Sequence, residues 1–212
     1  MLQLDHLVII APTLEEGAAH VYDELGVEMS PGGKHPQMGT HNLLLRLGDE
    51  VFLEVIAIDP AARPPSRPRW FGLDDNDHVR REWDDGRRLR AWVAQTDEIG
   101  TVLRSHADLL GAATPVSRGE RTWRFTLRHD GELPAGGIAP PVIDWSPKSN
   151  PARDMPDQGT TLRSFDLFTP EPERAEQTYA RLRVRDAPVV HEGDRQLFTA
   201  QVDTPSGVRS LS

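Results

Sequence analysis

Short apolar runs typical of buried strands alternate along the chain with segments of helical periodicity. The run Leu4–Ile10 is followed by apolar positions within 14–25 that recur at the spacing of one helix face. Thr13 is a typical N-cap residue and Gly26 a typical C-terminal stop, so the pattern predicts a helix between them. Further strands are predicted at 42–47 and 51–58, with a turn at 31–33. The first module therefore has the order β-α-β-β-β.

The same layout returns twice, and proline-rich stretches separate the copies. The second copy is predicted to have strands at 89–94, 121–127 and 141–145 and a helix from about 96 to 110. The third is predicted to have strands at 162–168, 196–202 and 207–211 and a helix at about 172–182. The predicted division is a first βαβββ module at 1–60, a proline-rich and charged linker at 61–87, a second module at 88–148, a linker at 149–159 and a third βαβββ-like module at 160–212.

One β-α-β-β-β unit is a sheet with a helix on one face, so its other face must be covered or closed into a barrel. Pairing two units satisfies this requirement. Three units leave one that packs edge-on or finds a partner chain, which is the basis for expecting a homodimer. The pattern as a whole predicts an α+β fold.

Composition narrows the class of protein. The chain has 24 Lys and Arg against 33 Asp and Glu, a net charge of −9, so it lacks the cationic surplus of a nucleic-acid-binding protein. The absence of cysteine excludes disulfides, a thiolate nucleophile and cysteine-type zinc sites. No apolar run approaches the roughly 20 residues of a membrane helix, and the first residues do not have the pattern of a signal peptide. We expect a cytoplasmic protein without a nucleic-acid or membrane partner.

Three polar side chains stand inside apolar strands at matching places of the first two modules. His6 lies in the first opening strand, Glu54 in the last strand of the same module, and Asp144 in the last strand of the second. Alternation turns Leu7 and Leu53 toward the helix and the imidazole and carboxylate to the opposite face. Such groups are costly to bury unless paired with each other, with solvent or with a metal. One imidazole and two carboxylates suit a divalent cation with open coordination positions.

Ordinary structural roles also remain open for each of these residues. His6 could be a hydrogen-bonded core histidine, and Glu54 could form an internal salt bridge with Arg46 or Arg124. Asp144 could simply begin the turn that follows its strand.

The sequence resembles the vicinal oxygen chelate superfamily, and within it the glyoxalase-like domain proteins of the glyoxalase/bleomycin resistance/extradiol dioxygenase fold. The resemblance rests on Leu-Asp-His-Leu-Val-Ile at 4–9, the glycine-rich segment 33–42, Phe-Leu-Glu-Val-Ile-Ala-Ile-Asp-Pro at 52–60 and Val-Ile-Asp-Trp at 142–145. It covers 1–148 closely and the third copy more loosely. It implies βαβββ modules paired into a U-shaped, partly open mixed β-barrel with helices outside, plus a third module.

In this superfamily a metal in the cleft is held by residues of the first and last strands of each paired module. The resemblance places His6, Glu54, Ala91 and Asp144 at these positions, and alanine cannot ligate. The implied metal set is therefore His6, Glu54 and Asp144, holding a divalent ion such as Zn, Ni, Mn or Fe. If the third copy paired with the first instead, two serines would replace the second module's residues.

The resemblance implies a lyase or isomerase that acts on a small oxygenated metabolite and stabilises an enolate or oxyanion. Glu54 and His6 are the expected catalytic residues, and Glu54 could alternatively act as a general base whose pKa is raised by the apolar wall. His35, Asn42 and Arg46 are the candidates for substrate contact. Ring-cleaving dioxygenation is less expected, because it usually needs two histidines. The alternative is a metal-free protein that binds or sequesters a small molecule.

Overall fold

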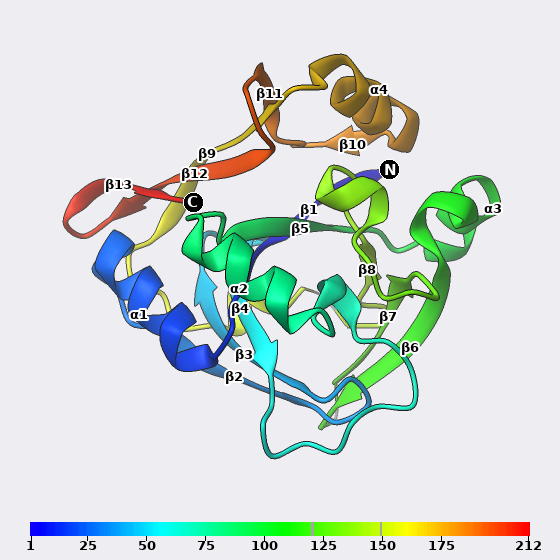
Figure 1. Ribbon diagram of the computed structural model, residues 1–212, viewed down its shortest axis with the longest axis horizontal. Coiled ribbons are helices and arrows are strands. Elements are labelled where there is room, and N and C mark those ends of the chain that lie inside the picture. Colours follow the sequence, from blue (N-terminus) through cyan, green and yellow to red (C-terminus); the bar gives the residue numbers. More distant parts are fainter. Residues whose placement is uncertain (120, 149) are drawn as a thin grey trace.

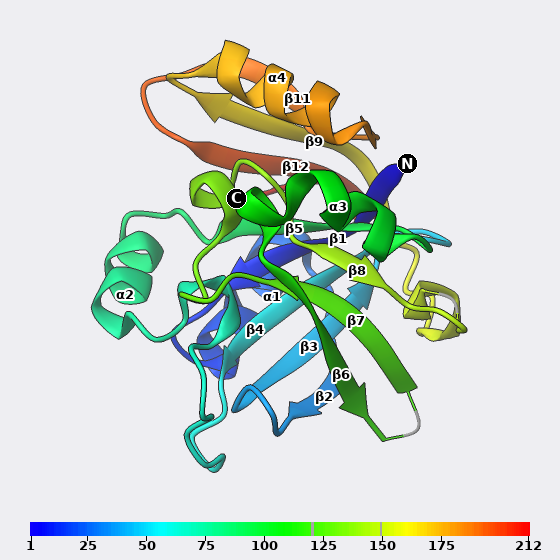
Figure 2. The same ribbon diagram turned by 90° about the vertical axis from the view of Figure 1, so that its right-hand side faces the viewer.

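The computed structural model describes residues 1–119, 121–148 and 150–212, and its first two modules share one curled sheet (Figures 1 and 2). The strand order is β2-β3-β4-β1-β5-β8-β7-β6, and β10 pairs with β1. The helices α1 and α3 lie outside this half-barrel. The bounds are β1 (Leu2–Ile10), α1 (Leu14–Leu25), β2 (Ser30–His35), β3 (Thr40–Arg46), β4 (Phe52–Ile58), β5 (Leu89–Gln95), α3 (Ile99–Leu110), β6 (Ala112–Arg118), β7 (Arg121–Leu127), β8 (Val142–Asp144) and β10 (Val184–Arg185).

The two modules meet where β1 and β5 run antiparallel. His6 lies opposite Val93, Leu7 opposite Trp92, and Val8 opposite Ala91. This register relates the two halves by an approximate two-fold axis that places Ala91 where the first half has His6. The first module therefore pairs with the second, and the α+β fold with paired modules is as predicted.

The capping residues of α1 behave as the sequence predicts. The Thr13 hydroxyl accepts a hydrogen bond from the backbone N–H of Glu16 at 3.1 Å. At the other end, Gly26 adopts a left-handed conformation with φ of 68° and donates to the Tyr22 carbonyl. Glycine enters this conformation without a steric penalty, so the helix ends there.

The charged stretch before β5 forms α2 (Asn76–Asp84), whose N-cap is Asp75. Although its sequence is polar, α2 buries Val79 and Trp83 against the rest of the fold. Three single-turn 3₁₀ helices complete the connections: η1 (Trp70–Gly72), η2 (Pro134–Gly137) and η3 (Pro151–Asp154).

Strand alternation divides the buried residues of the curled sheet into two cores. The outer-face core contains Leu7, Leu53 and Trp92. The inner-face core contains Val8 and Phe52, which alternate with them along the same strands. The outer face is covered by helices and by the third module, whereas the inner face encloses the hollow of the half-barrel.

The third module is a separate four-stranded sheet that packs on the outer face. Its order is β11-β9-β12-β13, and Trp92 of β5 contacts it with ring centroids 6.1 Å from Phe165 and 5.6 Å from Tyr179. The sequence pattern predicted that this module packs edge-on or against a partner chain; in the structure it packs on the outer face of the first two modules. A homodimer stays a prediction. The elements are β9 (Thr161–Thr169), α4 (Pro172–Leu182), β11 (Val189–Glu192), β12 (Leu197–Thr204) and β13 (Gly207–Leu211).

Two edge strands, β2 and β6, differ from the sequence prediction. The Pro-Gly-Gly stretch predicted as a turn lies within β2, and β6 was not predicted at all. Both contain proline, which a sheet tolerates at its edges, where the missing N–H costs no ladder hydrogen bond. No helix of the residues the structure describes is long and apolar enough to cross a membrane.

Candidate functional site

The inner face of the half-barrel holds a cavity of about 450 Å³, including the open space at its mouth. Most of its wall is aromatic or aliphatic, and a small group of polar side chains converges on it from both halves of the sheet. This composition is typical of a small-molecule site. The lining residues are His6, His35, Asn42, Leu44, Phe52, Glu54, Trp70, Phe71, Arg118, Trp123, Phe125, Ile143, Trp145 and Pro151.

The structure brings His6 and Glu54 together at the centre of this cavity. His6 Nε2 lies 3.4 Å from Glu54 Oε2, and the two residues are only 4% and 7% exposed. The imidazole stacks on the Phe52 ring, with centroids 4.5 Å apart. The inward orientation of both side chains is the one that strand alternation predicts.

A β-bulge in β1 adds Asp5 to this pair. Between Leu4 and His6 the pairing with β5 shifts by one residue, and Asp5 is the extra residue. Leu4 and Leu7 both pack in the outer-face core, so the two residues between them, Asp5 and His6, both turn away from that face. The Asp5 carboxylate accepts a hydrogen bond from His6 Nδ1 at 2.5 Å.

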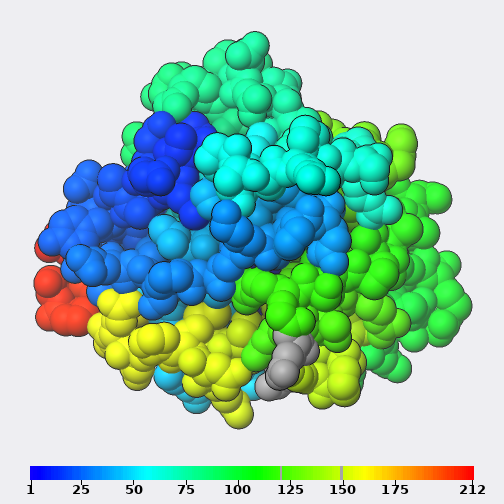
Figure 3. Space-filling model, turned by 90° about the horizontal axis from the view of Figure 1, so that it is seen from below, coloured from blue at the N-terminus to red at the C-terminus, as the bar shows by residue number. Residues whose placement is uncertain are grey.

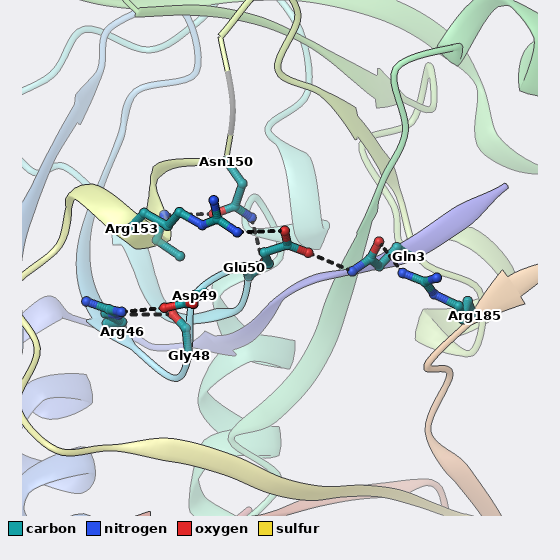
Figure 4. Close-up of polar contacts among 9 residues, drawn as sticks. Gln3, Arg46, Gly48, Asp49, Glu50, Asn150, Arg153 and Arg185 are labelled. Carbon is teal, nitrogen blue, oxygen red and sulfur yellow. Dashed lines mark hydrogen bonds and ion pairs between the residues drawn. The ribbon is translucent and has the colours of Figure 1, made fainter.

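Asp5 is fully buried and receives hydrogen bonds from three side chains. Its second oxygen accepts from Trp145 Nε1 at 2.8 Å and from Asn150 Nδ2 at 2.7 Å. Asn150 also donates to the Glu50 carbonyl at 3.0 Å, as Figure 4 shows. These three donors fix the position of the Asp5 carboxylate, which in turn holds the imidazole in one orientation.

The charges at the centre follow from these contacts. Burial alone would lower the pKa of His6, but the hydrogen bonds and charges of Asp5 and Glu54 outweigh it and raise that pKa to about 9. Burial would raise the pKa of Glu54, but the hydrogen bond and charge of His6 bring it below its ordinary value. The pKa of Glu54 is thus lowered, not raised by the apolar wall as the sequence suggested. At neutral pH an imidazolium faces a carboxylate.

Asn42 extends the polar cluster toward the second half of the sheet. Its Nδ2 donates to Glu54 Oε1 at 2.5 Å, and its Oδ1 accepts from Arg118 Nη1 at 3.3 Å. Arg118 comes from β6 and lies over the Trp123 ring, 6.0 Å from its centroid. The strands β2 and β6 lie side by side on the face shown in Figure 3, where the blue segment meets the green one.

His35 also lines the cavity, but its protonation state differs from that of His6. Its ring packs edge-on against Trp70, with centroids 5.1 Å apart, and its Nδ1 lies 3.2 Å from the Thr40 hydroxyl. Burial lowers the pKa of His35 to about 4, so this imidazole is neutral at physiological pH. Of the predicted substrate-contact residues, His35 and Asn42 lie in the cavity wall.

Asp144 and Arg46 are not among the residues that line the cavity. Ile143 and Trp145 point into it, so alternation turns Asp144 to the outer face, where it accepts from Arg124 Nη2 at 2.5 Å and from the Ser146 N–H. The Arg46 guanidinium donates to Gly48 and Asp49 of the hairpin turn, as Figure 4 shows. The Asp144 geometry matches the alternative role of beginning a turn.

The residues present do not fit the divalent metal that the resemblance implies. In the described ranges 1–119, 121–148 and 150–212, no group of three or more His, Cys, Asp or Glu side chains is arranged to hold a metal ion. His6 and Glu54 provide two donors, and Ala91 and Asp144 provide none in the cavity. The Arg118 guanidinium in the same wall also opposes the binding of a cation.

Comparison with known proteins identifies the family. The family model described as glyoxalase-like domain matches residues 4–183, which is most of the chain. The chain belongs to the glyoxalase-like domain family. The resemblance to this branch of the vicinal oxygen chelate superfamily is thereby confirmed. No curated protein matches the chain significantly.

Solved structures similar to this glyoxalase-like protein include a hypothetical protein from Staphylococcus aureus, with a TM-score of 0.61 and 10% identity over 93% of this chain and 88% of the other. At this identity the likeness shows the fold alone. A methylmalonyl-CoA epimerase from Mycobacterium tuberculosis has a TM-score of 0.43 and 15% identity, over 68% of this chain and 88% of the other. A Streptomyces coelicolor methylmalonyl-CoA epimerase variant in complex with 2-nitronate-propionyl-CoA has a TM-score of 0.45 and 14% identity, over 71% and 100%.

Sequence reasoning missed four residues of the site. Asp5 was hidden by the bulge, because regular alternation assigns it to the face opposite His6. Arg118 belongs to an unpredicted edge strand, and Asn150 lies in a segment interpreted as a linker. A signal was present only for Trp145, an aromatic residue at the end of the strand predicted at 141–145.

Proposed function

We propose that this glyoxalase-like protein is an enzyme of the isomerase or lyase type that moves a proton on a small carbonyl compound bound in the cavity. The observation that carries the proposal is the buried imidazolium–carboxylate pair of His6 and Glu54 in an aromatic wall. A proton transfer next to a carbonyl needs a base for the C–H and a donor for the oxygen that becomes negative. The pair supplies both groups side by side.

In the proposed reaction the His6 Nε2–H donates to the substrate carbonyl oxygen, while Asp5 holds Nδ1 and fixes the ring. The N–H then no longer serves Glu54, so the interaction that lowers the pKa of Glu54 weakens as the substrate binds. Glu54 becomes a stronger base at that moment, takes the proton from the adjacent carbon to leave an enolate held by His6, and then returns the proton to a carbon of that enolate as the carbonyl re-forms. Asn42 keeps the carboxylate in place through its hydrogen bond to Oε1. These steps use only side chains of this chain.

Deuterium exchange tests the proposal without knowledge of the product. The protein is incubated in D₂O with small 2-oxo acids, their esters and acyl thioesters, and loss of the α-proton signal is followed by NMR. We expect at least one compound to exchange, and Glu54→Gln to slow this exchange by about 100-fold or more. Glu28→Gln, at an exposed position, is the matched control and should exchange normally. Equal exchange by Glu54→Gln and the unaltered protein would contradict the assignment of the base.

The aromatic wall favours a second candidate, a protein that binds or sequesters a small molecule. Trp70, Trp123 and Trp145 provide a large apolar contact surface that does not need the ionised pair. Ligand binding that quenches tryptophan fluorescence, without exchange of any bound compound, would favour this second function.

A further inference from the structure

The cavity wall contains the guanidinium of Arg118, which comes from β6. Arg118 forms no ion pair with any residue that the structure describes, and its guanidinium donates a hydrogen bond to the neutral amide of Asn42. Its side chain is partly buried, and this burial, together with the nearby charge of Arg121, lowers the pKa of Arg118 despite the opposing influence of Glu54. A partly desolvated guanidinium without a carboxylate is electrostatically unfavourable, and an anion beside it would relieve this cost.

The other charged side chains of the site, Asp5, His6 and Glu54, form ion pairs with one another and not with Arg118. His6 lies between Asp5, at 2.5 Å, and Glu54, at 3.4 Å. Neutral His35 adds no charge. Asn42 separates Arg118 from Glu54 and contacts both of them. The His6–Glu54 pair thus lies at one end of the Asn42 amide and the Arg118 guanidinium at the other.

Two glycines of β2 make room for this arrangement. A Cβ atom on Gly33 would lie 2.6 Å from Cδ of Arg118, and one on Gly32 would lie 2.2 Å from Oδ1 of Asn42. Both distances are far below van der Waals contact. The absence of side chains at these positions lets the arginine cross from β6 to Asn42.

We propose that Arg118 determines the substrate class: the cavity takes a small carboxylic acid with a largely apolar body, whose carboxylate pairs with the guanidinium. A guanidinium presents N–H groups in a planar fork that matches a carboxylate. The aromatic wall, including Trp123 beneath the arginine, receives the apolar body. The inference rests on the proposed function, because it places the carboxylate at one end of Asn42 and the reacting carbon at Glu54.

Binding measurements test this inference separately from catalysis. Phenylacetate, benzoate and isovalerate are each compared with the corresponding neutral amide by quenching of tryptophan fluorescence. We expect at least one acid to bind about tenfold or more tightly than its amide, as for a charge-assisted contact. Arg118→Gln should remove this preference. Gly33→Ala, which displaces the arginine without removing its charge, should reduce it.

Arg163→Gln is the matched control, because this arginine is exposed on the third module and should leave the preference unchanged. Equal binding of acids and amides, persistence of the preference in Arg118→Gln, or no binding of any acid at millimolar concentration would overturn the proposal. A preference for acids without deuterium exchange would support the acid site while contradicting the proposed proton transfer.

Discussion

The two halves of the curled sheet share a topology but contribute different chemistry. The first half supplies Asp5, His6 and Glu54, whereas the second half places Ala91 at the position related to His6 and turns Asp144 away. In return, the second half supplies Arg118 and much of the aromatic wall. The comparison teaches that an approximate two-fold axis in the backbone does not impose a symmetric set of side chains. The first half contributes two carboxylates and a histidine to the site, and the second half contributes an arginine and aromatic side chains.

Among these predictions, removal of the Asp5 carboxylate from the first half should cause the largest loss of stability. Asp5→Ala would leave His6, Trp145 and Asn150 without their shared acceptor in a buried site, so we expect a loss of about 3–5 kcal/mol in the free energy of unfolding. Urea unfolding followed by circular dichroism measures this loss. Asp108→Ala, on the exposed surface of α3, should change the stability by less than about 0.5 kcal/mol. Similar losses in the two variants would show that Asp5 does not anchor the site.

The raised pKa of His6 predicts a stability that falls at alkaline pH. Because its pKa is about 9 in the folded state and 6.5 in the unfolded chain, its contribution is fully present below pH 6.5 and is lost as the pH rises through 9. The expected loss is on the order of 3 kcal/mol. The lowered pKa of Glu54 adds no slope in this window, since Glu54 is ionised in both states. Urea unfolding at pH 6.5 and 9 measures the change.

His6→Gln is the control for this pH dependence. It should unfold with nearly the same free energy at pH 6.5 and at pH 9, because the titrating group is gone. An equally steep decline in His6→Gln and the unaltered protein would assign the pH dependence to other groups.

The smallest expected loss of stability follows from a change at Asp144, the carboxylate of the second half. Asp144→Asn should cost about 1–2 kcal/mol of stability, since it weakens hydrogen bonds with Arg124 and the Ser146 N–H. It should leave ligand binding in the cavity unchanged, because the carboxylate lies on the outer face. Titration with a carboxylic acid that binds the unaltered protein, followed by tryptophan fluorescence, measures this binding. A large loss of ligand binding in Asp144→Asn would contradict this and would show that both halves contribute a carboxylate to the site.

Much of the fold could be predicted from local signals. The helix α1 could be predicted to the residue, because Thr13 and Gly26 use capping chemistry that is encoded locally. The inward orientation of His6 and Glu54 followed from alternation in regular strands. These features depend on residues that are close in sequence, so they can be predicted from one amino-acid sequence.

The remainder of the site depends on departures from regularity. The bulge at Asp5 shifts the alternation by one residue, and nothing in Leu-Asp-His marks it. Asp144 was matched to Glu54 by sequence likeness, but β8 pairs Val142 with Ala94 whereas β4 pairs Glu54 with Val8, so the two strands have different registers. Arg118 reaches the cavity from β6, an edge strand that contacts the other edge strand, β2. Such relations are set by tertiary packing.

The chain that leaves the half-barrel after β8 forms part of the cavity before it reaches the third module. Asn150 binds Asp5, and Pro151 lines the wall. A shortened version of the protein reduced to the paired modules must therefore keep this crossing segment, or the carboxylate that holds His6 loses one of its hydrogen-bond donors. The same crossing joins the third module, through Asn150 and Asp5, to the His6 imidazole by two hydrogen bonds.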